Sequence, residues 1–180
     1  MRVLYGAHPM IALRCTQKLL IRLKAKPGLD GTVATTVLGH WYANLIYIGR
    51  QQLILCVSER SFLPVLLTAK DTATFPSRLF SGVGWLLSRI GVPEFALDHE
   101  LREMQDFVIG RTQSRQVLGV MNEMAFCLSV VRDRYVDVPL EEPTLYLADT
   151  IYGPIGYKSP IEVTRQLFGL SGRDTAAHHN

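Results

Sequence analysis

Five stretches of the chain show the alternating or continuously apolar pattern of β-strands. Three of them lie between residues 41 and 67 and are separated only by the short polar breaks 49–52 and 59–61. Breaks of this length are typical of β-hairpins, so this part of the chain predicts an antiparallel meander. Two shorter candidates stand apart from it. The predicted strands are 11–14, 41–48, 53–58, 62–67 and 107–109.

Apolar residues spaced three and four apart predict helices around these strands. The last helix has the clearest start, since Ser159, Pro160 and Glu162 provide a cap, a first-turn proline and a reciprocal capping-box glutamate. The Pro- and Gly-bearing stretch 139–160 predicts an extended segment over the surface. The predicted helices are 16–26, 75–90, 93–104, 114–134 and 160–168.

Together these elements predict a single α+β domain. We expect a small, largely antiparallel sheet of three to four strands packed against amphipathic helices. The 180 residues are 48% hydrophobic, which is enough for one core without disulfide or metal support. We expect this domain to span residues 10–170, with a variable N-terminal extension (1–9) before it and a disordered tail (171–180) after it.

Composition argues against several classes of protein. Lys and Arg number 19 against 16 Asp and Glu, an excess too small to indicate a nucleic-acid or membrane partner. Cys15, Cys56 and Cys127 lie far apart in apolar stretches without a C-x-x-C motif, so we expect reduced core residues. We expect no metal site and no cofactor. Because no stretch has the apolar run of a secretory signal or a membrane span, we expect a soluble cytoplasmic protein.

Motifs of common enzyme classes are absent from the sequence: it has no G-x-S-x-G, no P-loop and no H-E-x-x-H. Gly82 and Gly84 lie within a predicted helix and indicate close approach by another element rather than a dinucleotide site. His99, Glu100 and Glu103 place three potential metal ligands on one helical turn. The favoured interpretation of these three is an exposed, charged helix face.

A more informative cluster is His40-Trp41-Tyr42, at the entry to the first meander strand. A titratable ring beside two large aromatic side chains is suited to binding a base or another flat ligand. The structural alternative, which we favour, is a core tryptophan flanked by polar groups at the end of the sheet.

The segment 110–123 suggests an anion site. On a helix, Arg115, Gly119 and Asn122 fall within one narrow sector, so the glycine leaves a notch between a cation and an amide. With Arg111 near the helix start, this notch would suit a phosphate, a carboxylate or an acidic side chain. The structural alternative pairs Arg115 with an acidic residue of the preceding helix and places Asn122 in the core.

Several separated motifs resemble a bacterial family known only as a domain of unknown function. The resemblance covers about residues 10–168, and its beginning near Met10 implies that residues 1–9 are variable. In that family we expect Asp at the position of His40, and Asp is frequent at that of Glu123. The resemblance implies no activity. The motifs are LRCTQKLL (13–20), LGHWYANL (38–45), VSER (57–60), LPV (63–65) and SRQVLGVMNE (114–123).

The sequence thus favours a non-catalytic intracellular binding or interaction domain with an anion-binding notch. Its partner would be a protein or a small anionic ligand, with nucleic acid a weaker choice and no membrane contact. One alternative is an enzyme for a phosphorylated or nucleotide substrate, with His40 as acid or base. Another is a structural subunit that assembles with itself or a neighbour. The candidate ligand-binding residues are His40, Trp41, Arg111, Arg115 and Asn122.

Overall fold

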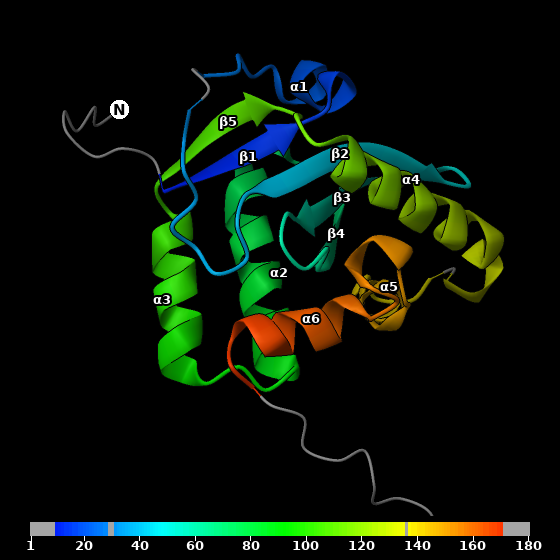
Figure 1. The fold of residues 1–180 in the computed structure, drawn as a ribbon. Helices are drawn as coiled ribbons and strands as arrows, with labels where there is room; N and C mark the ends of the chain where they lie inside the picture. The colour runs from blue at the N-terminus through cyan, green and yellow to red at the C-terminus, as the bar shows by residue number, and fades with distance from the viewer. Residues whose placement is uncertain (1–9, 29–30, 136, 171–180) are drawn as a thin grey trace, which may run out of the picture.

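The computed structural model describes residues 10–28, 31–135 and 137–170, which leaves the predicted extension (1–9) and tail (171–180) outside. Within these ranges the chain forms five strands and six α-helices (Figure 1). The strands are β1 (Ile11–Cys15), β2 (Trp41–Ile48), β3 (Gln51–Ser58), β4 (Pro64–Thr68) and β5 (Phe107–Arg111). The helices are α1 (Gln17–Leu23), α2 (Phe75–Arg89), α3 (Glu94–Met104), α4 (Arg115–Val130), α5 (Glu141–Asp149) and α6 (Pro160–Leu167).

The strands make one mixed sheet with the order β4-β3-β2-β1-β5. As the hairpin breaks predicted, β2, β3 and β4 are antiparallel neighbours, whereas β1 runs parallel to both β2 and β5. The expected α+β class is confirmed. The prediction of a largely antiparallel sheet with three to four strands was wrong, because the sheet has five strands and is mixed. The individual strands were foreseen; their parallel pairing was not, because parallel neighbours are joined by long crossovers that leave no local turn signal.

A second correction concerns residues 139–160, which contain α5 rather than only an extended segment. Pro143 is the third residue of this helix, where the backbone N–H has no intrahelical partner, so the proline removes no hydrogen bond. The helix predicted to reach residue 134 ends as α4 at Val130 and is followed by a 3₁₀ turn, Arg132–Tyr135. In the described part of the chain, no helix has the length and apolar character needed to cross a membrane.

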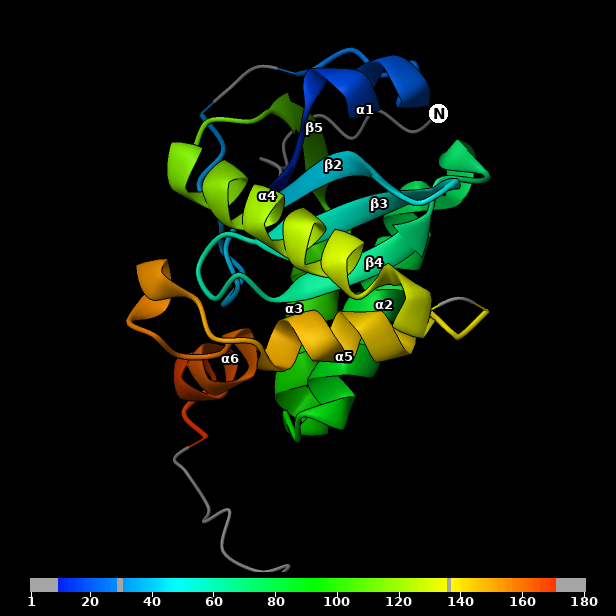
Figure 2. The same ribbon diagram turned by 90° about the vertical axis from the view of Figure 1, so that its right-hand side faces the viewer.

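Different helices cover the two faces of the sheet. On one face, Leu13 and its strand neighbours pack with α1, α2 and α3 in the larger core. On the other face, Met121 of α4 and Leu147 of α5 enclose a second core. Figure 2 shows α4 crossing the sheet, with α5 beside β4. The site described below lies on this second face, where α4 begins.

The glycine pair of α2 serves close packing, as the sequence indicated. A Cβ atom on Gly82 would lie 2.7 Å from Cγ1 of Val65 in β4, and one on Gly84 would lie 3.0 Å from Cδ1 of Leu101 in α3. Both distances are tighter than ordinary van der Waals contact. These two glycines therefore bring α2 against the edge strand and against α3.

Candidate functional site

An open cavity lies beside the start of β2, and we call it the Arg14 cavity. Its volume is about 620 Å³, within the range of small-molecule sites. The wall combines β1, the loop before β2, the β3–β4 turn and the segment that leads from β5 into α4. The described residues that line it are Arg14, Gly31, Thr32, Val33, Ala34, His40, Glu59, Arg60 and Gln113.

Arg14 gives this cavity a buried positive charge. Side chains alternate along a strand, so Arg14 lies on the face opposite to Leu13, next to Tyr42 of β2 and Gly110 of β5. The arginine is only 4% exposed, and its Nη1 donates a hydrogen bond to the Arg111 carbonyl at 3.2 Å. The guanidinium therefore places a positive charge in the cavity wall.

His40 is a bridge between β1 and the loop before β2. Its Nδ1 accepts a hydrogen bond from the backbone N–H of Ala12 at 3.0 Å, which requires that nitrogen to be unprotonated. The backbone of Thr32 also lies near the imidazole and acts to raise its pKa. One ring nitrogen is thus occupied by a backbone partner.

Glu100 of α3 holds the same loop from the other side. The carboxylate is completely buried and accepts backbone N–H hydrogen bonds from Val37 at 2.7 Å and Leu38 at 2.9 Å. Burial raises its pKa, whereas these two hydrogen bonds oppose that shift. The prediction that Glu100 faces solvent was wrong. That prediction treated all polar residues of α3 as one exposed face, whereas only some of them are exposed.

The β3–β4 turn completes the cavity. Nη1 of Arg60 donates to two successive loop carbonyls, the first of them Thr36 at 3.1 Å and the second at 3.3 Å. Oε2 of Glu59 accepts the backbone N–H of His40 at 3.3 Å. Gly39 has a φ of +78°, and a Cβ there would lie 3.0 Å from the side chains of both turn residues. Glycine at this position lets the loop pass under the turn.

Burial favours a neutral His40. Burial lowers the pKa of its imidazole, and Arg14 and Arg60 lower it further, while Glu59 and the nearby Thr32 backbone act in the opposite direction. Burial likewise raises the pKa of Tyr42, while the backbone at the start of α4 acts to lower it. With the imidazole neutral, the described side chains of the wall carry two positive charges and one negative charge.

The structure separates the other predicted anion-site residues from this cavity. Arg115 and Asn122 lie on one exposed face of α4, as their spacing predicted. A Cβ on Gly119 would have no atom within 4 Å, so the face is open. Nη1 of Arg111 donates to Oε1 of Gln17 at 2.9 Å. The alternative that placed Asn122 in the core was wrong, because its side chain is exposed.

Trp41 lies in the larger core and is fully buried, as its structural alternative expected. A ligand in the cavity therefore does not stack on its indole. Cys15 and Cys56 are buried free thiols, and Cys127 is partly buried. Among the residues that the structure describes, no group of three or more His, Cys, Asp or Glu side chains is arranged to hold a metal ion.

Comparison with known protein families assigns most of the chain to one family. A model described as "Domain of unknown function (DUF6933)" matches residues 12–163, which is most of the chain. The chain belongs to the DUF6933 family. The DUF6933 match includes every described residue of the Arg14 cavity. No curated protein matches the chain.

Of the nine described lining residues of this DUF6933 chain, only His40 was selected from sequence; those missed include Arg14, Glu59, Arg60 and Gln113. The first three belong to the motifs LRCTQKLL and VSER, and His40 belongs to LGHWYANL. Each motif alone looks like strand or turn sequence. The missing signal was the parallel pairing of β1 with β2, which brings the three motifs to one place.

Proposed function

We propose that this domain is a non-catalytic binding module whose ligand is a small anion held in the Arg14 cavity. A phosphate or carboxylate group is the suitable class. The observation that carries the proposal is the position of Arg14, almost completely buried yet lining an open cavity beside Arg60. Guanidinium groups bind such oxyanions through paired N–H donors.

The surroundings of Arg14 support this ligand class. Gln113 adds an amide to the wall, and Glu59 is the one carboxylate among the described lining residues. A buried charge interacts more strongly with a ligand than an exposed one, because less water screens it. The loop hydrogen bonds of Glu100 and Arg60 fix the wall before a ligand arrives, which lowers the ordering cost of binding.

Binding is favoured over catalysis because of His40. An acid or base must be free to exchange a proton with the substrate. Nδ1 of His40 instead accepts a hydrogen bond from the backbone N–H of Ala12. Proton transfer by His40 would break the link between β1 and the loop.

Calorimetry with pyrophosphate, citrate and inorganic phosphate tests the proposal. Arg60→Gln should weaken binding of the best anion by about tenfold or more, because it removes a charge-assisted contact. Arg115→Gln is the matched control, since it removes an exposed arginine outside the cavity. Melting temperatures of the ligand-free variants show whether both remain folded.

Two results would contradict this assignment. If none of the three anions binds the folded wild-type protein, the module does not bind small anions of this class. If Arg115→Gln weakens binding and Arg60→Gln does not, the site lies on the exposed face of α4 instead.

A further inference from the structure

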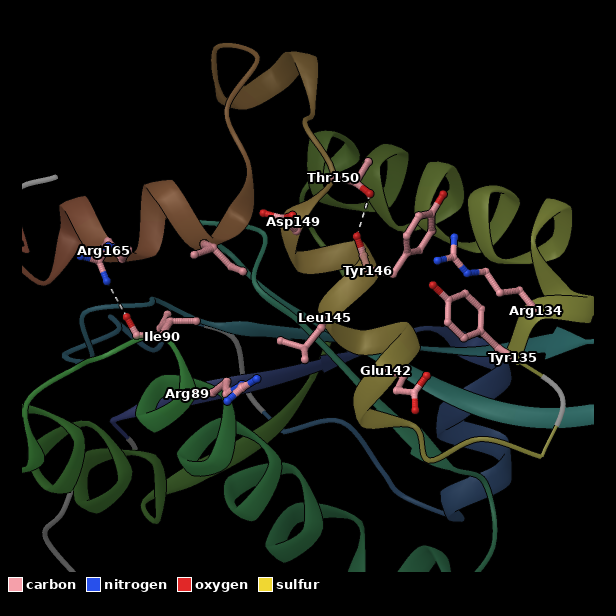
Figure 3. Close-up of a pocket in the computed structure, with 11 residues that line it drawn as sticks. Arg89, Ile90, Arg134, Tyr135, Glu142, Leu145, Tyr146, Asp149, Thr150 and Arg165 are labelled. Atoms are coloured by element: carbon pink, nitrogen blue, oxygen red, sulfur yellow. Dashed lines mark hydrogen bonds between the residues drawn. The ribbon is translucent and has the colours of Figure 1, made fainter. Parts of the chain in front are cut away.

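A second hollow lies between α2, α5 and α6, and we call it the α5 hollow (Figure 3). Its volume is about 930 Å³, and it shares no lining residue with the Arg14 cavity. Leu145 of α5 lies near its centre, with Ile90 and Ile161 adding apolar surface. The remainder of the wall is polar, charged and aromatic. This combination suits a ligand with an apolar body and charged ends.

Opposite charges line this hollow without neutralising each other. Arg89 and Arg165 lie toward one end, and Glu142 and Asp149 project from α5 (Figure 3). Within the described residues, none of these four side chains forms an ion pair with another. Arg165 is fixed by a hydrogen bond from its Nη1 to the Ile90 carbonyl at 2.7 Å. Separated charges of both signs are therefore available to a bound molecule.

An aromatic wall closes the other end. The rings of Tyr135 and Tyr146 lie 5.8 Å apart between centroids, at an interplanar angle of 45°. The guanidinium carbon of Arg134 is 5.9 Å from the Tyr135 centroid, and Figure 3 shows this arginine beside both rings. Such a wall offers apolar contact area at a small cost in side-chain entropy.

We propose that the α5 hollow binds a zwitterion with an apolar side chain, either a free amino acid or a short peptide with free termini. Its carboxylate is held by Arg89 and Arg165, and its ammonium group by Asp149, the acidic residue of α5 on the Arg165 side of the hollow. The apolar side chain packs on Leu145 and the tyrosine wall. Arginine suits the carboxylate and an aspartate suits the ammonium, so one ligand satisfies separated charges of both signs.

Calorimetry with four probes tests this proposal: leucine, the dipeptide Leu-Leu, N-acetyl-Leu-Leu and Leu-Leu amide. Acetylation removes the ammonium charge, and amidation removes the carboxylate charge. We expect either cap to weaken binding relative to Leu-Leu by about tenfold, as for loss of one charge-assisted contact. Comparing leucine with Leu-Leu distinguishes the amino acid from the peptide.

Matched variants then assign each end. Arg89→Gln should weaken Leu-Leu by about tenfold and leave Leu-Leu amide unchanged, whereas Asp149→Asn should weaken Leu-Leu and leave N-acetyl-Leu-Leu unchanged. Arg102→Gln and Asp98→Asn, exposed positions of α3, are the controls. The proposal is overturned if neither uncapped probe binds at millimolar concentration, or if capped and uncapped dipeptides bind equally well.

Discussion

The Arg14 cavity and the α5 hollow differ in how their polar and charged side chains are held. Around the cavity, Arg14, His40 and Glu100 are buried and hydrogen-bonded to the backbone. Around the hollow, Arg89 and Glu142 are exposed and form no ion pair within the described chain. Buried polar groups contribute to stability because leaving a partner unsatisfied is costly, whereas exposed charges contribute little. The residues around the cavity should therefore contribute to the stability of the ligand-free fold, and the charges of the hollow should contribute little.

The largest effect should come from removing Glu100. Glu100→Ala leaves the backbone N–H groups of Val37 and Leu38 without their acceptor inside the protein, and we expect it to lower the free energy of unfolding by about 2–5 kcal/mol. It should also weaken anion binding in the Arg14 cavity, because the loop that forms its wall loses an anchor. Urea denaturation measures the first effect and calorimetry the second.

Glu103→Ala is the matched control for this variant. Glu103 is on the same helix and also contacts the loop, but through one exposed hydrogen bond from Thr35 Oγ1 at 2.6 Å. Its removal should cost less than about 1 kcal/mol. If both variants lower the free energy of unfolding by the same amount, burial does not make Glu100 more important than Glu103. The contrast between the cavity and the hollow would then be contradicted.

A smaller effect should follow the protonation of His40. Its pKa is lowered in the folded protein, chiefly by burial, so the unfolded chain binds the proton more readily. Its contribution to stability is complete above its unfolded pKa, near 6.5, and falls as pH decreases toward the folded pKa. The Ala12 hydrogen bond lost on protonation corresponds to about 1 kcal/mol.

Urea denaturation from neutral to mildly acidic pH measures this contribution. His40→Asn keeps an acceptor for the Ala12 N–H but does not titrate, so it should lose this part of the pH dependence. The pKa of Glu100 is also shifted, but Glu100 is present in both the wild type and His40→Asn. The difference between their pH profiles is therefore specific to His40. His99→Asn is the control, since it removes an exposed histidine of α3 and leaves His40 intact. A wild-type pH profile in His40→Asn would contradict the bridging role.

Local sequence signals predicted those parts of the fold that local interactions determine. The hairpin breaks located the β2–β3–β4 meander. The predicted capping box of α6 is present, with the Glu162 N–H donating to Ser159 Oγ at 3.2 Å and the Ser159 N–H donating to Glu162 Oε2 at 2.8 Å. The parallel pairs of β1 were missed because they join residues far apart in sequence, and α5 because a proline in its first turn resembles a loop signal.

The site was harder to predict than the fold because its residues come from four separate segments of the chain. Sequence spacing identified the exposed face of α4 with Arg115 and Asn122, since a single helix determines it. It did not identify Arg14, which looked like an ordinary member of a short strand. Nor did it show that Glu100 is buried, because the loop that covers Glu100 comes from more than 60 residues earlier in the chain.

The smallest effect should come from the charges of the α5 hollow in the absence of ligand. Arg89→Gln and Glu142→Gln should each change the free energy of unfolding by less than about 0.5 kcal/mol, because both side chains are exposed and unpaired within the described structure. Urea denaturation in parallel with Glu100→Ala tests this directly. A loss above about 1 kcal/mol in either variant would mean that these charges stabilise the fold. The hollow would then resemble the Arg14 cavity, and its separated charges would be structural rather than available to a ligand.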